Sequence, residues 1–183
     1  PIWHNNFDNF TQRNYPAIPN YDWSKFTCKI NINRPTETIY DAWTIPQQLE
    51  QWFVRTATFT RSNGTLREPF LHIQKDDTYT WLWHAHPDTI VEKGTVLHAN
   101  EKDKLQFSFT AGGIVTIDIG EALGETIVML TQENIPTDEK AKINYHIGCL
   151  AGWTFYLTNL KSFLEGGLDL RNKNTTLSNM INS

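Results

Sequence analysis

The sequence predicts an α+β domain in which a curved antiparallel sheet of six or seven strands surrounds a long C-terminal helix, with two short helices after the first strand. Two features of the chain predict this class. Residues 136–167 form the one long segment with helical periodicity, because its apolar positions recur at intervals of three and four. Most of the chain before it alternates apolar and polar residues between turn signals, as antiparallel strands do. We therefore expect a sheet built to receive one long helix.

Composition narrows the classes of function. The 183 residues suffice for one domain with a sizeable core, and the net charge of −4 comes without a clustered basic stripe, so we expect no nucleic-acid partner. No apolar run approaches the roughly 18 residues of a membrane span. The first residues lack the basic and apolar regions of a signal peptide, and we expect a cytoplasmic protein. Cys28 and Cys149 are far apart in sequence and favour two buried free thiols over a disulfide.

The start of the chain predicts an irregular arm, one strand and two short helices. Residues 1–20 are rich in Asn, Pro and aromatic residues, and we expect either an arm on the domain surface or a partly disordered leader. Residues 26–33 alternate as a half-buried strand, with their apolar side chains on one face. Helical spacing then predicts short helices at residues 36–43 and 47–53, with Pro46 between them.

The middle of the chain predicts a meander of antiparallel strands. Short turn signals rich in Gly, Asn and Asp separate alternating runs of strand length. Within these runs, Trp81 and Trp83 share one face, and so do Phe107 and Phe109, which makes all four candidates for the inner face of the sheet. The expected strands span residues 56–61, 69–74, 79–85, 89–99, 104–110, 114–119 and 126–133.

The long helix has recognisable ends. Thr137 or Asp138 can cap its first turn, and the glycine pair 166–167 supplies its stop. The polar tail that follows, residues 172–183, is expected to have weak order. The predicted domain therefore spans residues 21–171.

Several segments resemble a known superfamily. Residues 32–44 run from the first strand through Pro35 to Trp43, and they resemble the opening signature of the START-like (SRPBCC) superfamily, in which a helix that begins at Pro and ends in Trp follows the first strand. Residues 45–52 resemble the next helix of that superfamily. The remaining similar segments are residues 94–97 with 104–107 in the middle strands, and Gly152-Trp153 with Leu157, Leu160 and Leu164 in the last helix.

Together these segments look like the branch related to the activator of the heat-shock protein 90 ATPase, over about residues 26–171. The resemblance implies the helix-grip fold, in which the sheet curves around the last helix and a cavity lies between them. It also implies one of three activities: binding a lipid or other hydrophobic ligand, acting as a cyclase on such a ligand, or assisting a chaperone.

A cavity between sheet and helix is the first candidate site. Gly148 and Gly152 lie four residues apart and remove side chains from one flank of the helix. Tyr145, Trp153 and Tyr156 would add polar tips to an apolar lining, as is usual in small-molecule sites. The alternative is a core that the aromatic residues, 13% of the chain, fill completely. The predicted lining consists of Trp43, Trp52, Trp81, Trp83, Phe107, Phe109, Tyr145, Gly148, Cys149, Gly152, Trp153 and Tyr156.

The titratable residues give no supported site for catalysis or for a metal. His84 and His86 could share a metal ion from one face of a strand, but they alternate with the tryptophans and are expected to face solvent. His146 falls at the margin of the helical stripe, which favours a place on the helix flank over a role as a base. Asp76 and Asp77 sit in a turn signal. We therefore predict no catalytic residue, no metal and no cofactor.

The sequence thus leaves three functions, in order. The first is binding of a hydrophobic small molecule or lipid in the cavity, with no covalent chemistry. The second is a chaperone-associated interaction protein of the stress response, similar to the ATPase activator, that binds through its surface. The third is a cyclase- or lyase-like enzyme that uses the same pocket. The ligand, the partner and the oligomeric state do not follow from the sequence.

Overall fold

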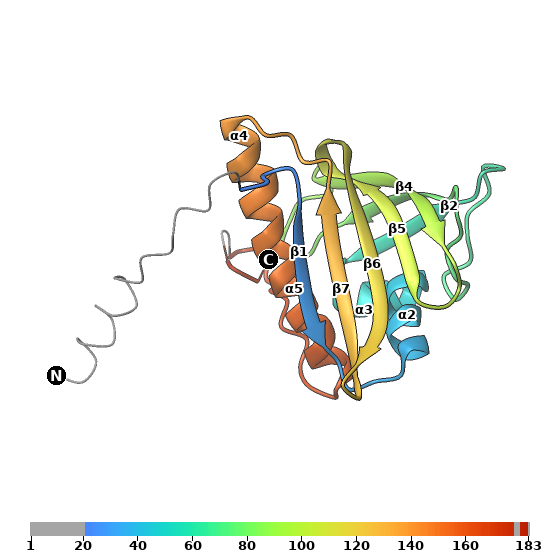
Figure 1. The fold of residues 1–183 in the computed structure, drawn as a ribbon. Helices are drawn as coiled ribbons and strands as arrows, with labels where there is room; N and C mark the ends of the chain where they lie inside the picture. The colour runs from blue at the N-terminus through green and yellow to red at the C-terminus, as the bar shows by residue number, and fades with distance from the viewer. Residues whose placement is uncertain (1–20, 178–179, 183) are drawn as a thin grey trace.

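Seven antiparallel strands form one curved sheet (Figure 1). The computed structural model describes residues 21–177 and 180–182, so the predicted N-terminal arm lies outside the described residues. The strands follow the order β1-β7-β6-β5-β4-β3-β2, which confirms the predicted fold class. Their bounds are β1 (Phe26–Asn31), β2 (Thr56–Thr60), β3 (Thr78–Leu82), β4 (Val91–Ala99), β5 (Lys104–Phe109), β6 (Gly113–Ala122) and β7 (Glu125–Glu133).

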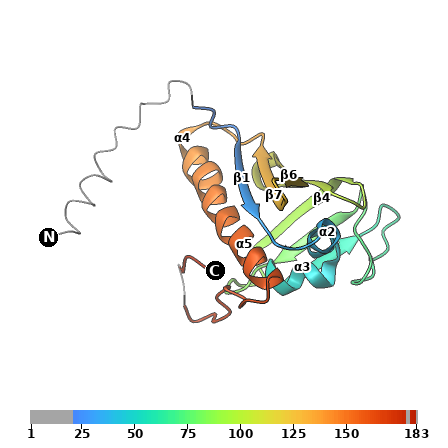
Figure 2. The same cartoon turned by 60° about the horizontal axis from the view of Figure 1, so that its bottom comes forward.

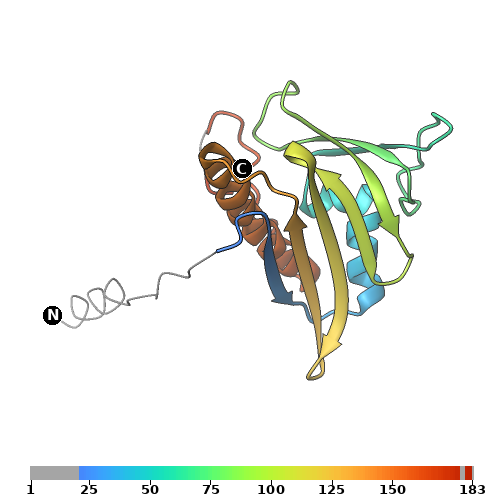
Figure 3. The ribbon, with the colours of Figure 1, turned by 45° about the horizontal axis from the view of Figure 1, so that its top comes forward.

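Three helices lie on the concave side of the sheet. The long helix α5 (Gly148–Leu164) runs alongside the edge strand β1, as Figures 1 and 2 both show. The short helices α2 (Thr36–Thr44) and α3 (Pro46–Trp52) lie on the same side of the sheet as α5 (Figure 3). Because α3 contacts both β2 and α5, the short helices and the long helix enclose one interior with the sheet.

The long helix begins and ends where the sequence predicts, but it is not uniform. Asp138 caps it, because its carboxylate accepts a hydrogen bond from the Ala141 backbone N–H at 3.1 Å. Gly166 ends it with φ +86°, a left-handed conformation that favours glycine. Between a first α-helical turn, α4 (Glu139–Ala141), and α5 lies a π-helical segment, η2 (Lys142–Ile147), which the regular periodicity does not predict.

His146, in this π-helical segment, is buried rather than placed on the helix flank as predicted. Its Nε2 lies 2.8 Å from the Tyr21 hydroxyl, and its Nδ1 lies 2.8 Å from the Trp23 carbonyl oxygen. The chain that precedes β1 therefore covers the imidazole. Both ring nitrogens therefore have a hydrogen-bond partner, and His146 connects the start of the long helix to the residues just before β1.

One of the predicted strands is wrong. Residues 69–74 form an irregular segment that pairs with the short helices instead of the sheet. The Gln47 N–H donates to the Pro69 carbonyl, and the Ile73 N–H donates to the Thr44 carbonyl, both at 2.8 Å. These bonds use backbone groups at the junction of α2 and α3, so the segment's polar groups are satisfied without a strand partner.

A buried ion pair follows this segment. Asp77, which the sequence places in a turn signal, is 2% exposed. Its carboxylate accepts hydrogen bonds from the guanidinium of Arg67 and from the backbone N–H of Gln74. Asp77 therefore holds the irregular segment in place, and a structural role accounts for its burial.

The two cysteines are free thiols, but they are half-buried instead of buried as predicted. No helix in the described part of the chain is both long and apolar enough to cross a membrane.

Candidate functional site

An apolar pocket of about 110 Å³ lies between α5 and the inner face of the sheet, and it is open to solvent on one side. No side chain in its lining carries a charge. The lining consists of Phe53, Trp83, Phe109, Cys149, Gly152, Trp153 and Tyr156, and all of these except Phe53 were predicted from the sequence.

The two glycines of the long helix have different roles. A Cβ atom built on Gly152 would meet nothing within 4 Å, and Gly152 lines the pocket, so its missing side chain leaves open space there. Gly148 is exposed and lies outside the lining. Tyr145 also lies outside the lining and packs, partly buried, against the core. Only one of the two glycines therefore contributes to the hollow.

Phe53 forms the inner wall of the pocket. The side chain is 1% exposed, and its ring stacks on Trp153 at a centroid distance of 5.3 Å and meets Tyr156 edge-on at 4.7 Å. The sequence places Phe53 at the end of a short helix. Helical spacing alone carries no signal that this ring reaches across to α5.

Residues far along the chain fix the position of Phe53. Three backbone carbonyls at the end of α3, those of Glu50, Gln51 and Val54, accept hydrogen bonds from the Arg171 guanidinium at 2.6–3.0 Å. The Asn159 amide donates to the Trp52 carbonyl at 2.6 Å. These donors satisfy carbonyls that the end of a helix leaves without partners, and they hold Phe53 against α5.

The rest of the interior is nearly filled. Trp43, Trp81 and Phe107 line a separate cavity of only about 10 Å³. Trp52 lines neither hollow and donates its indole N–H to the Ala42 carbonyl at 2.9 Å. Trp43, Trp52 and Phe53 are each at most 2% exposed and belong to the core. The two sequence-based alternatives, a cavity and a solid core, therefore describe different parts of one interior.

The polar tips predicted around the pocket are only partly available to a ligand. The Trp153 indole N–H already donates to Gln132 Oε1 at 2.8 Å. The Tyr156 hydroxyl meets no hydrogen-bond partner among the residues that the structure describes. Burial raises the pKa of Tyr156 to about 12, so the phenol stays protonated at neutral pH. Tyr156 is therefore a group at the pocket that can donate to a ligand.

Sequence reasoning missed one carboxyl group near the pocket. Glu92 on β4 lies directly opposite Trp81 of β3, so its half-buried side chain is on the inner face of the sheet. Burial raises the pKa of Glu92 to about 7, although a hydrogen bond from the Thr110 backbone N–H acts in the opposite direction. Its charge also contributes to raising the pKa of the Cys149 thiol, after the larger effect of burial. The predicted strand includes Glu92, but the sequence shows no apolar context for it.

The two histidines that were considered as metal ligands, and expected instead to face solvent, do not lie on a strand. His84 and His86 lie in the turn after β3, and His86 is exposed. Partial burial, and then the positive charges of Arg171 and Lys173, lower the pKa of His84 to about 4. Within residues 21–177 and 180–182, no group of three His, Cys, Asp or Glu side chains is placed to hold a metal ion.

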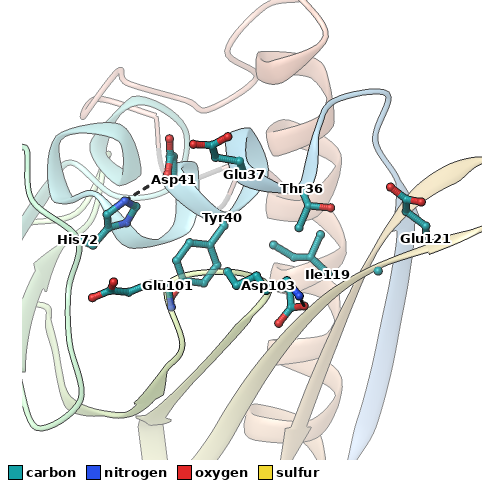
Figure 4. Close-up of a pocket in the computed structure, with 11 residues that line it drawn as sticks. Thr36, Glu37, Tyr40, Asp41, His72, Glu101, Asp103, Ile119 and Glu121 are labelled. Carbon is teal, nitrogen blue, oxygen red and sulfur yellow. Dashed lines mark hydrogen bonds and ion pairs between the residues drawn. The ribbon is translucent and has the colours of Figure 1, made fainter.

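A second hollow, of about 530 Å³, lies between α2, the turn that joins β4 to β5, and β6 (Figure 4). His72 at its edge lies 3.4 Å from the Asp41 carboxylate, and the Tyr40 hydroxyl accepts a hydrogen bond from the Glu101 backbone N–H. Five acidic side chains and one lysine line this hollow, so it is a negatively charged groove beside α2. It is lined by Thr36, Glu37, Tyr40, Asp41, His72, Glu101, Lys102, Asp103, Ile119, Gly120 and Glu121.

The architecture defines a class of protein. A seven-stranded antiparallel sheet that curves over a long C-terminal helix, with two short helices after the first strand, is the helix-grip arrangement of the START-like (SRPBCC) superfamily. Within that class, the chain belongs to the family described as Activator of Hsp90 ATPase homolog 1-like protein, whose profile matches residues 33–165. A search of curated proteins gives no match.

Solved structures share the fold at low sequence identity. The protein SSP2350 from Staphylococcus saprophyticus is 19% identical, with a TM-score of 0.60 over 80% of this chain and 96% of that protein. The Aha1 dimer from Colwellia psychrerythraea is 16% identical, with a TM-score of 0.59 over 78% of this chain and 97% of that one. DynU16, from the dynemicin biosynthetic locus, is 17% identical, with a TM-score of 0.63 over 82% of this chain, which spans 50% of DynU16.

Proposed function

We propose that the protein binds an apolar small molecule, or the apolar part of a lipid, in the pocket beneath α5, without covalent chemistry. The observation that carries the proposal is the pocket itself, a hollow of about 110 Å³ whose lining is aromatic apart from Cys149 and Gly152. An apolar cavity of about 150 Å³ in another protein stays dry and binds benzene. A pocket of the present size, open on one side, therefore suits one ring or a short chain segment, with Tyr156 donating to any polar group of the ligand.

Two matched substitutions test this proposal. Gly152→Leu places a side chain in the open space of the pocket, whereas Gly148→Leu places the same side chain on the exposed side of the same helix. Both changes remove a glycine from a helix, which stabilises a helix by up to about 1 kcal/mol. Only Gly152→Leu is expected to weaken the binding of benzene, by about tenfold or more, because the pocket is then filled.

Benzene binding is measured by NMR titration, and the free energy of unfolding by urea denaturation. If Gly152→Leu binds benzene as well as Gly148→Leu does while both variants are folded, the pocket is not the binding site. In a separate experiment, mass spectrometry of organic extracts of the purified protein identifies the natural ligand. The Gly152→Leu variant should carry less of this ligand than the Gly148→Leu variant.

A second candidate function is association with a chaperone through the surface. Two observations favour it: the family description names an activator of the Hsp90 ATPase, and the negatively charged groove beside α2 suits a basic segment of a partner. Reversal of charge by Glu37→Lys together with Glu121→Lys should weaken binding to purified Hsp90, while Gly152→Leu should leave it unchanged. The opposite pattern would assign chaperone binding to the pocket instead of the groove.

A further inference from the structure

The side-chain amide of Gln132, on β7, has one end bonded and one end free. The side chain is 0% exposed, and its Oε1 accepts a hydrogen bond from the Trp153 indole N–H at 2.8 Å. An indole nitrogen only donates, so this bond fixes which end of the amide carries the oxygen, and Nε2 points away from Trp153. Nε2 completes no hydrogen bond among the described residues. Because buried donors in native proteins are nearly always paired, this N–H indicates an acceptor that the folded chain alone does not supply.

The free end of this amide lies beside the thiol of Cys149. Cys149 and Trp153 are four residues apart and share one face of α5, so the oxygen of Gln132 meets one of them and its nitrogen lies toward the other. Burial raises the pKa of the Cys149 thiol, and the Gln132 amide acts in the opposite direction, as a donor to a thiolate does. A neutral thiol is only a weak acceptor. The N–H is therefore placed for negative charge that develops at or near this sulfur.

The same thiol is accessible from the apolar pocket. Cys149 is half-buried and belongs to the lining, and the pocket is open to solvent on one side. The raised pKa leaves little thiolate at neutral pH, but a thiolate of high pKa is the stronger nucleophile. A donor that is already in position offsets part of the cost of forming this charge. A nucleophile, a hydrogen-bond donor and an apolar space thus meet on one face of α5.

The second cysteine shows what is specific to Cys149. Cys28 is half-buried as well, and burial also raises the pKa of its thiol. The hydroxyl beside it, that of Thr154, already donates to the Leu150 carbonyl at 2.7 Å. Cys28 also lies outside the lining of the pocket. Of the two thiols, Cys149 alone combines a free buried donor with space for a ligand.

We propose that Cys149 forms a reversible covalent bond with an apolar aldehyde in the pocket, and that Gln132 Nε2 donates to the oxygen of the adduct. The sulfur forms a bond to the carbonyl carbon, the π electron pair of the C=O bond moves to the oxygen, and the thiol proton reaches that oxygen through solvent. The product is a hemithioacetal, and the reverse reaction releases the aldehyde. Nothing is oxidised or reduced. The inference goes beyond the non-covalent binding of the proposed function and rests on the same pocket.

The lining of the pocket favours an aldehyde over other reaction partners of a thiol. No charged side chain belongs to the lining, so a charged disulfide would lose its hydration there without a counter-charge. A ketone would bring a second substituent on the reacting carbon into a pocket of about 110 Å³. In a hemithioacetal the oxygen is two bonds from the sulfur, so a donor beside the sulfur can reach it. The body of the aldehyde, about the size of one ring, contacts the aromatic walls.

A pair of probes of nearly equal shape tests the inference. Cyclohexanecarbaldehyde carries a C=O group where vinylcyclohexane carries C=CH₂, and only the aldehyde can add a thiol. The wild-type protein should bind the aldehyde about tenfold or more tightly than the alkene, because the pocket holds the two reacting groups together. In ¹³C spectra of the labelled aldehyde, the carbonyl signal should be replaced by that of a tetrahedral carbon bonded to oxygen and sulfur.

Three variants assign the groups. Cys149→Ser should remove the adduct signal and the preference for the aldehyde. Cys28→Ser is the matched control and should leave both as in the wild type. Gln132→Glu keeps an oxygen for the Trp153 indole but replaces the free N–H, and should lose most of the preference. The ratio of the two affinities is the readout, because a general loosening of the pocket would weaken both probes alike.

The outcomes separate the inference from the proposed function. If the wild type binds both probes equally and shows no adduct signal, the covalent step is wrong while pocket binding stands. An adduct that persists in Cys149→Ser would overturn the assignment of the thiol, and an unchanged preference in Gln132→Glu would overturn that of the donor. If neither probe binds, the proposed function fails, and the inference fails with it.

Discussion

The interior of this protein has two halves that are built from the same elements. One half is filled with side chains, and the other contains the apolar pocket. On β5, Phe107 is 2% exposed, whereas Phe109, two residues further on the same face, is half-buried and lines the hollow. In the same way, Trp81 on β3 is buried, whereas Trp83, two residues further along the chain, is half-buried. Toward α2 and α3 the space is filled by indole rings. Toward the start of α5, Gly152 and Cys149 replace large side chains, and a pocket remains. These two small residues leave a space of about 110 Å³ beside the helix.

The largest expected effect comes from truncating the same residue type in each half. Phe107→Ala should lower the free energy of unfolding by about 4 kcal/mol, since it leaves a closed cavity in the filled half. Phe109→Ala should cost about 2 kcal/mol or less, because Phe109 is already partly exposed and borders existing space. Urea denaturation of both variants measures the difference. Equal losses would mean that the half with the pocket is packed as tightly as the other.

The boundary between the two halves depends on Arg171, and replacing Arg171 is expected to have the next largest effect on stability. Arg171→Ala leaves three carbonyls at the end of α3 without their side-chain donor and removes the guanidinium beside Asp169, and should cost about 3 kcal/mol. Because Phe53 then loses its support, benzene affinity should fall as well. Arg171→Lys keeps the charge but lacks the forked geometry, and should recover only part of the stability. Full recovery by lysine would show that charge, and not the fork, holds the end of α3.

The ion pair between Asp169 and Arg171 makes part of this stabilisation sensitive to acid. Burial acts to raise the pKa of Asp169, but hydrogen bonds from Arg171 and Lys173 outweigh it and hold the pKa well below its usual range. Since the folded pKa is lower than the unfolded one, the stabilisation is present above the unfolded pKa and is lost as the pH falls. The acid sensitivity should therefore shrink in the Arg171→Ala variant.

The smallest expected effect is a pH dependence near the pocket. Glu92 has a folded pKa of about 7 against an ordinary value of 4.5, so its contribution to stability is fully present below pH 4.5 and is lost as the pH rises through 7. The melting temperature of Glu92→Gln should consequently change less between pH 5 and pH 8 than that of the wild type. An identical pH profile for the two proteins would show that Glu92 is not shielded from water.

Local sequence patterns determined much of this protein. The inward faces of β1, β3 and β5, both short helices, the cap at Asp138 and the stop at Gly166 all follow from periodicity and from preferences that act over a few residues. Six of the seven residues that line the pocket were predicted in the same way.

The remaining features depend on contacts between segments that are far apart in the sequence. Phe53 reaches the pocket because Arg171, more than a hundred residues later, holds the end of α3. Residues 69–74 pair with the short helices, and His146 is buried by Tyr21 and Trp23, both through contacts with no local signal. Periodicity says which face of an element is apolar. Whether that face is filled or left open depends on the side chains that distant segments bring to it, and that is decided only when the sheet closes over the helix.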